Sequence, residues 1–267
     1  VALITRNKET KVAILQISKD IKWSLFTGNT VETIDLSAPI AEGNQAGEFS
    51  LAVNDSTRSY FFLKTKNGTA ILAEKHLPMT GGYNFRDMGG LKNKEGQFIK
   101  WGRVFRSDDL HSLTDADLTY LGSIPLHSII DFRSPIEIEK APDKLPGSAK
   151  GYHLSINPGS LSANDMQFVL DMKAEEMVDF MKEMNRSFST DSTIIEQYRT
   201  FFAMLQDETK LPLMFHCTAG KDRTGMAGAL FLYSLGVDEN VIIEDYLLSN
   251  LYLGDKFASY ITQYPNL

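Results

Sequence analysis

The sequence predicts an α/β protein in which a small all-β, sandwich-like domain precedes a parallel-sheet domain. Residues 1–77 alternate short apolar runs with turn signals, which is typical of strands. The rest of the chain alternates strand and helix patterns, as parallel sheets do. The Pro/Gly-rich stretch 77–82 separates the two parts. We therefore expect a β domain over 1–77 and an α/β domain over 78–267.

Six runs in the first domain have the length and composition of strands. Turn residues separate them, and Asn67-Gly68 between two apolar runs is a hairpin signal. Strands at this spacing favour a small sandwich. No cluster of residues here indicates catalysis, so we expect a packing or targeting role. The expected strands are 12–17, 21–26, 31–36, 49–53, 60–64 and 70–73.

The second domain contains two apolar runs, 127–132 and 211–216, that show little alternation. Such runs are typical of strands covered on both faces in a parallel sheet. Between them, apolar residues recur at three- and four-residue intervals and predict an amphipathic helix. The methionines of 161–188 leave two interpretations open, core packing or a mobile lid over the site. The recurring residues are Met166, Val169, Leu170, Met177, Phe180, Met181 and Met184.

Three further helices are expected. Asp191 or Ser192 is a suitable N-cap for a helix that carries apolar residues as far as Leu205. Another helix runs over 224–235 and ends at Gly236, because glycine commonly follows the last helical turn. A last helix covers 241–248.

Composition and charge narrow the function classes. Apolar residues make up 43% of the chain and charged residues 23%, which is ordinary for a globular protein. The net charge of -7 argues against a general nucleic-acid binder, which needs clustered Lys and Arg. An anionic small substrate stays compatible, because a local positive pocket can dominate the field at a site.

Three features bear on the compartment and leave it open. No apolar run has the length that crossing a bilayer requires. The chain begins with Val1, so a preceding export signal can be missing from it, and both the cytoplasm and export are compatible. The single cysteine excludes an intramolecular disulfide and a four-cysteine zinc site.

The decisive segment is 216–225, His-Cys-Thr-Ala-Gly-Lys-Asp-Arg-Thr-Gly, which joins an expected strand to an expected helix. A loop of this kind directs backbone N–H groups and a helix N-terminus at one point, where an anion binds. The same positive field lowers the pKa of a thiol from about 8.5. Cys217 is therefore the predicted nucleophile, and Arg223 suits a bidentate grip on phosphoryl oxygens.

The neighbours of these two residues have predicted roles as well. Ala219 and Gly220 keep the bowl free of bulky side chains, and Lys221 adds charge at its mouth or is a solvated lysine. The hydroxyl of Thr224 stabilises the departing thiolate, and His216 orients the loop. The predicted substrate-binding residues are Thr218, Ala219, Gly220, Lys221, Thr224, Asp131 and Arg86.

The segment resembles the signature loop of protein tyrosine phosphatases, and more narrowly that of bacterial tyrosine/serine phosphatases of the cyanobacterial and mycobacterial type. Four other segments are similar to that family over about residues 80–253. The resemblance implies a phosphatase domain, a phosphocysteine intermediate, and lipid-directed members among the relatives. The four segments are NFRDMGG at 84–90, Arg106-Ser107, DFRS at 131–134 and DYLLSN at 245–250.

The general acid stays open between two aspartates, because the Trp-Pro-Asp loop of the larger eukaryotic enzymes is absent from the sequence. Asp222 lies inside the loop and is the favoured candidate. Asp131 ends an expected strand, where ligands of α/β sheets gather, or it pairs with a nearby arginine. The family-like arginines, Arg86, Arg106 and Arg133, either line the site or form structural ion pairs. His111 and His153 have no motif around them.

The function expected from these observations is hydrolysis of phosphate monoesters, with phosphotyrosine proteins, and phosphoserine or phosphothreonine proteins as well, as substrates. A phosphoinositide or inositol phosphate is the alternative substrate. An inactive phosphate-binding module is the alternative from another class, although such proteins usually lack the Cys or the Arg. Arsenate reduction or sulfur transfer fits less well, since no second cysteine exists. Cys, Arg and Asp suffice for this chemistry, so no metal or organic cofactor is expected; the oligomeric state is unreadable.

Overall fold

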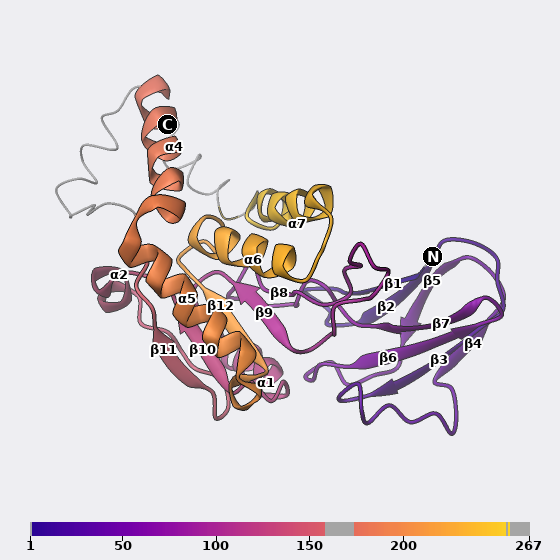
Figure 1. Ribbon diagram of the computed structural model, residues 1–267. Coiled ribbons are helices and arrows are strands. Elements are labelled where there is room, and N and C mark those ends of the chain that lie inside the picture. Colours follow the sequence, from indigo (N-terminus) through magenta and orange to yellow (C-terminus); the bar gives the residue numbers. More distant parts are fainter. Residues whose placement is uncertain (1, 158–173, 255, 257–267) are drawn as a thin grey trace.

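The computed structural model describes residues 2–157, 174–254 and 256, and it shows a mixed α/β protein (Figure 1). The regular elements of residues 2–72 are strands, and they form two sheets at one end of the molecule. The first sheet has the order β1-β2-β5 and the second β4-β3-β6-β7. Their bounds are β1 Ala2–Arg6, β2 Ala13–Ile17, β3 Trp23–Gly28, β4 Ala41–Gly43, β5 Gly47–Leu51, β6 Tyr60–Thr65 and β7 Gly68–Leu72.

Both N-terminal sheets contribute to one apolar cluster. Leu15 and Ile17 come from the first sheet, and Trp23 and Phe61 from the second. Side chains on one face of each sheet are thus removed from water, which is the stabilising term for paired sheets. The strand predicted over 31–36 is wrong. Asp35 alone bridges to Thr27 there, and a polar turn occupies the rest.

The remaining strands form one sheet with the order β11-β10-β12-β9-β8. Its first four strands are parallel and β8 is antiparallel. The predicted parallel strands over 127–132 and 211–216 are confirmed as β10 and β12, which are neighbours. The bounds are β8 Arg86–Asp87, β9 Val104–Ser107, β10 Ser128–Asp131, β11 Lys150–His153 and β12 Leu213–His216.

Helices cover both faces of this sheet. Phe215 of β12 packs in a cluster with Phe201 of helix α5, whereas its neighbour Met214 packs in a second cluster with Leu121 of α1. The alternation of side chains along a strand explains why one strand serves two layers. The helices are α1 Asp115–Gly122, α2 Pro135–Lys140, α4 Ala174–Thr190, α5 Ser192–Gln206, α6 Arg223–Ser234 and α7 Glu239–Tyr252, with a 3₁₀ turn at Glu208–Lys210.

The helix predictions agree with α5, α6 and α7, and Asp191 caps α5 by accepting from the amides of Thr193 and Ile194. Of the methionine-bearing segment, 158–173 lies outside the described residues. The described part, α4, extends away from the sheet (Figure 1). Phe188 near its end is 3% exposed and packs in the core, while Val178 is 52% exposed. Among the described residues, none of the helices has the length and hydrophobicity that a membrane span requires.

Buried charges join the N-terminal sheets to the α/β part. Arg58, between β5 and β6, lies 2.8 Å from Asp87 of β8, and both side chains are fully buried. Glu74 lies 2.8 Å from Arg6 and 4.0 Å from Arg58, and is also fully buried. Leu77 is 0% exposed, so the stretch predicted as the domain boundary packs in the interior. The two parts of the chain therefore share a buried ionic contact.

Replacing Arg58 by Met should lower the free energy of unfolding by about 3–5 kcal/mol, because Asp87 and Glu74 would lose a buried partner. Urea denaturation followed by circular dichroism measures the change. Lys64→Met, at an exposed position of β6, removes the same charge and should change stability by less than about 0.5 kcal/mol. Equal denaturation midpoints for both variants would show that the Arg58 contact does not stabilise the fold.

Candidate active site

The candidate site begins at the carboxyl ends of the parallel strands. Asp131, His216 and Ser107 end β10, β12 and β9 and lie side by side in register. This edge is where open α/β sheets bind ligands. The loop 217–222 leaves β12 there and leads directly into α6, which begins at Arg223. The chain between strand and helix is short, so the loop must turn tightly over the sheet edge.

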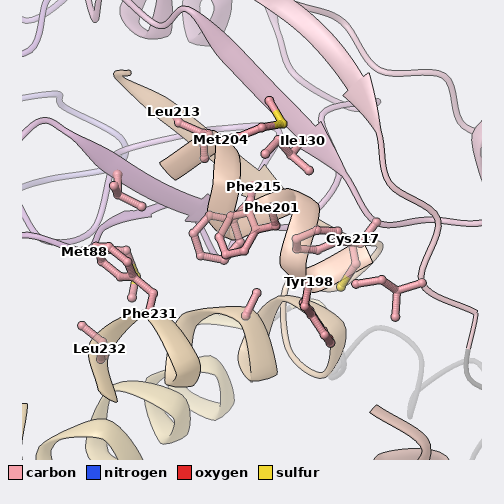
Figure 2. Close-up of a cluster of buried hydrophobic side chains, with 14 of the residues drawn as sticks. Met88, Ile130, Tyr198, Phe201, Met204, Leu213, Phe215, Cys217, Phe231 and Leu232 are labelled. Carbon is pink, nitrogen blue, oxygen red and sulfur yellow. The ribbon is translucent and has the colours of Figure 1, made fainter. Parts of the chain in front are cut away.

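Cys217 lies at the base of this loop and is 3% exposed. Figure 2 shows it beside Tyr198 at the margin of the apolar cluster. Burial raises the pKa of the thiol. Arg223, the hydroxyl and amide of Thr224 and the amide of Gly220 together lower this pKa by more than burial raises it, so the net shift is downward. A thiol in this setting ionises more easily than a free one and is a better nucleophile.

Two side chains hold the loop carbonyls away from the sulfur. Asn84 donates from Nδ2 to the carbonyl oxygens of Ala219 and Gly220, both at 3.0 Å. Arg106 donates from Nη2 to the same Gly220 oxygen at 2.8 Å. Gly220 has φ +65°, and a Cβ there would lie 2.3 Å from the oxygen of Ser107. The loop therefore needs glycine at this position, and the amide of Gly220, like that of Thr224, faces Cys217.

Buried cations surround Asp245 behind the loop. Its carboxylate lies 3.2 Å from Arg106, 3.2 Å from Lys75 and 3.6 Å from Arg86. Burial raises the pKa of Asp245, and the three cations lower it to about 2. Arg86 also donates to the Asp245 carbonyl and to Ser249, and it is 0% exposed. This placement favours the ion-pair interpretation of Arg86 and Arg106, and it connects α7 to the loop.

Arg223 is gripped by a carboxylate that the sequence interpretation did not include. Glu137 of α2 accepts from Nη1 and Nη2 of Arg223, each at 2.7 Å, and from the Thr218 hydroxyl at 2.5 Å. Burial raises the pKa of Glu137, and Arg223 lowers it well below its usual range. Ser134 fixes Glu137 in turn through a capping box. Besides Glu137, the guanidinium interacts with the Thr218 hydroxyl, 3.3 Å from Nη2, and with Cys217, so it lies between the α2 carboxylate and the sulfur.

The other predicted loop residues lie where the sequence places them. Thr218 is exposed, Ala219 and Lys221 are partly exposed, and Thr224 is buried beside the sulfur. Lys221 has no ion pair within the part of the chain that the structure describes. Asp222 is the N-cap of α6 without accepting a capping hydrogen bond, and the Tyr246 hydroxyl donates to its Oδ1 at 3.4 Å.

Asp131 is engaged by Arg133, whose Nε and Nη2 donate to its carboxylate at 2.8–3.1 Å. Asp131, Asp143 and His216 offer ligand-type atoms within 4.8 Å of one another, which is a metal-like grouping. Arg133 Nη2, however, lies 2.8 Å from both carboxylates and supplies the positive charge that an ion would bring. We therefore assign the group to an ion-pair cluster, which favours the structural interpretation of Asp131.

The two unassigned histidines contact backbone oxygens. A ring nitrogen of His153 lies 2.7 Å from the Arg133 carbonyl, and one of His111 lies 3.1 Å from that of Pro142. Both agree with ordinary polar roles.

Several site residues escaped the sequence interpretation. Glu137 and Asp143 belong to none of the motifs, although the Ser134-Pro-Ile-Glu137 capping box is readable and marks Glu137 as the third residue of a helix. Asn84 and Asp245 lie inside family-like segments, but their contacts cross 135–139 positions of sequence. Spacing in the sequence cannot predict a contact between residues so many positions apart.

A thiol of lowered pKa under backbone amides and a guanidinium defines a class of proteins that hold phosphate beside a cysteine. Residues 77–266 match the tyrosine phosphatase family, and the chain belongs to that family.

Three curated proteins are similar to this chain. A putative tyrosine-protein phosphatase of Cupriavidus necator is 36% identical over 173 residues, 62% of this chain and 60% of that protein. The triple specificity protein phosphatase PtpB of Mycobacterium tuberculosis is 29% identical over 205 residues, 67% of this chain and 70% of that protein. A tyrosine-protein phosphatase of Nostoc commune is 29% identical over 152 residues. The chain spans less than two thirds of the first and third of these relatives.

Among solved structures, the core catalytic domain of the PP-IP phosphatase Siw14 from S. cerevisiae, in complex with citrate, aligns with 70% of this chain and 96% of its own. The identity is 12% and the TM-score is 0.36, so this likeness carries no argument about the present chain.

The pH profile of Cys217 alkylation should respond in opposite directions to two substitutions. Arg223→Met removes the nearest cation and should move the profile to higher pH. Glu137→Gln removes the anion bound to that cation and should move it to lower pH. Iodoacetamide labelling measures this cleanly, because Cys217 is the single cysteine.

Two exposed positions serve as controls for these charge changes. Arg199→Met and Glu139→Gln should leave the alkylation profile where it is in the unmodified protein. A profile that does not move with Arg223→Met contradicts the placement of the guanidinium beside the sulfur.

Proposed function

We propose that this protein hydrolyses phosphate monoesters through a phosphocysteine intermediate, with Cys217 as nucleophile and Arg223 as phosphate clamp. The observation that carries the proposal is the placement of Cys217 between Arg223 and the amides of Gly220 and Thr224, which also lowers the pKa of its thiol. The tyrosine phosphatase family, to which the chain belongs, supports the same chemistry.

In the first step the Cys217 thiolate attacks phosphorus, forming an S–P bond as the P–O bond to the leaving group breaks. The loop amides and Arg223 would bind the non-bridging oxygens and hold the phosphoryl group in line between the sulfur and the leaving oxygen. Thr218, Ala219, Gly220 and Lys221 would line the ligand. Glu137 would orient Arg223 for this grip.

Asp222 is the proposed general acid. Its side chain has no ion pair within the described residues, whereas both oxygens of Asp131 accept from Arg133. Asp222 would give its proton to the leaving oxygen and then accept one from water, which attacks phosphorus and releases phosphate. The hydroxyl of Thr224 lies by the sulfur, where it can stabilise the departing thiolate.

Phosphotyrosine proteins are the proposed substrates, with phosphoserine or phosphothreonine proteins as further ones. A phosphoinositide is the second candidate, and the triple-specificity name of the mycobacterial relative favours keeping it. Lys221, a partly exposed cation of the loop, would suit a second phosphate group. Initial rates on a panel of phosphopeptides and inositol phosphates distinguish the candidates.

The N-terminal part, residues 1–77, is proposed to be a small sandwich-like domain that packs on a phosphatase domain over 78–267. Its two sheets share one apolar cluster, which supports this organisation. The buried contact of Arg58 with Asp87 favours a packing role over an independently moving module.

Cys217→Ser should lower the rate of p-nitrophenyl phosphate hydrolysis by at least about a thousandfold, because a neutral serine hydroxyl is a far weaker nucleophile in this setting. The variant should still bind inorganic phosphate or vanadate, since the loop amides and Arg223 remain. A protein that binds phosphate but shows no hydrolysis even with Cys217 intact would instead be an inactive phosphate-binding module.

Asp222→Asn should lower kcat by about a hundredfold for phenyl phosphate, a poor leaving group that needs a proton, and far less for p-nitrophenyl phosphate. Asp131→Asn, a matched change, should affect the two substrates alike because its role is structural. If Asp131→Asn alone shows the leaving-group dependence, the acid assignment is reversed; if neither variant shows it, both assignments fail.

A further inference from the structure

Four charged or chargeable side chains meet beneath the loop. Arg133 Nη2 lies 2.8 Å from Asp131 Oδ2 and 2.8 Å from Asp143 Oδ2. Nε2 of His216 lies 3.1 Å from the same Asp143 oxygen and 3.9 Å from Asp131 Oδ1. Arg133 and His216 are 1% and 0% exposed, and the side chains of Asp131 and Asp143 are each 11% exposed. We call these four residues the buried quartet.

The charges of the buried quartet cancel only when His216 is protonated. Two carboxylates bring two negative charges, and Arg133 brings one positive charge. An unbalanced charge in a buried position is costly, so a second positive charge is favoured there. His216 is the remaining member that can supply it, by taking up a proton.

The contacts of His216 favour the same protonation state. Nδ1 is in hydrogen-bond contact with the Cys217 carbonyl oxygen at 3.2 Å. Nε2 lies 3.1 Å from an Asp143 oxygen, in an ion-pair contact without hydrogen-bond alignment. A neutral imidazole has one N–H, so either neutral tautomer would leave an uncharged nitrogen lone pair close to one of these oxygens. The imidazolium has an N–H at both nitrogens and presents positive charge to both oxygens.

We propose that Asp143 is a positioning residue for the nucleophile loop, acting through His216: its carboxylate holds the imidazole doubly protonated, and the imidazolium holds the Cys217 carbonyl toward the interior. Turning this carbonyl inward keeps its negative end away from the site where phosphate would lie. The inference deepens the proposed function and rests on it, because the loop it positions is the proposed phosphate site.

Asp143 is itself held firmly. It follows α2, and its Oδ1 accepts from the Leu110 amide at 2.9 Å. Arg133 donates to the carbonyl of Ala141, two residues before it, at 2.8 Å. These contacts fix the carboxylate against the imidazole without any contribution from the loop 217–222. A change at Asp143 therefore reaches Cys217 through His216.

The direction of the pKa shifts agrees with this arrangement. Burial lowers the pKa of His216, whereas Asp143 and Asp131 raise it, Arg133 lowers it, and the net shift is upward. Burial raises the pKa of Asp143, but His216 and Arg133 lower it more. A raised imidazole pKa means that the imidazolium persists to higher pH than in an ordinary histidine and is lost as the pH rises through that raised value.

Histidine ¹³Cε1–H NMR titration of the whole protein tests the charge state without reference to activity. The chain has five histidines, and the signal missing from His216→Gln identifies the one of interest. His216 should titrate above the ordinary histidine value, and in Asp143→Asn it should titrate lower. Titration at or below the ordinary value in the unmodified protein overturns the proposal, whether or not the Asp143 variant folds.

Steady-state kinetics tests the positioning role. For Asp143→Asn, kcat/KM should fall roughly tenfold at about pH 8, where His216 of the variant is neutral. At about pH 5.5, where His216 of the variant is protonated, it should fall little. Glu139→Gln, an equal charge change at an exposed position of α2, should leave kcat/KM unchanged at both values. A loss that is the same at both pH values, with His216 still titrating high, indicates a merely structural aspartate and overturns the proposal.

The two measurements separate this inference from the proposed function. A high titration of His216 in a protein without phosphatase activity leaves the buried quartet intact and removes the proposed reaction. Normal phosphatase activity with a neutral His216 supports the proposed reaction and overturns the inference about Asp143 and His216.

Discussion

The geometry of the site depends on keeping the loop carbonyls turned away from Cys217. Peptide carbonyls are negative ends of dipoles, so the loop can receive an anion only if they point elsewhere. Asn84 donates hydrogen bonds to the carbonyl oxygens of Ala219 and Gly220, and Arg106 donates to that of Gly220. His216 contacts the carbonyl oxygen of Cys217. Their donors come from β8, β9 and β12, strands or strand neighbours of one sheet. The loop is thus held from below by the sheet, and its inward amides follow from that.

The same construction explains why so much charge is buried. Asp245 lies among three cations behind the loop, and the buried quartet lies beneath it. In both groups, charges of opposite sign lie in contact, which limits the cost of desolvation. A chain of contacts continues into the N-terminal sheets, because Asp87 of β8 pairs with Arg58. The N-terminal β part therefore contacts β8, the strand that contains Arg86 and begins two residues after Asn84.

Local patterns predicted what depends on neighbours in sequence. Periodicity and turn chemistry act over a few residues, so several local features are readable: the N-cap of α5, the end of α6, the parallel strands 127–132 and 211–216 and the short loop that joins β12 to α6. The prediction of a strand over 31–36 failed because this segment forms a turn, with a single bridge from Asp35 to Thr27 instead of a paired strand. Five strands, β1, β4, β8, β9 and β11, and two helices, α1 and α2, went unpredicted. All but α1 have six residues or fewer, and β4 and β8 have only three and two, too few for a period to show.

The sequence by itself determined the chemistry of the loop: a cysteine, small residues that leave amides bare, and an arginine six positions on, where a helix begins. Which groups complete it was decided by the tertiary structure alone. Glu137 reaches Arg223 across 86 positions, and Asp143 reaches His216 from a separate segment. The physical reason is that charge pairing and burial depend on distance in space, and only the folded sheet brings those segments to one edge.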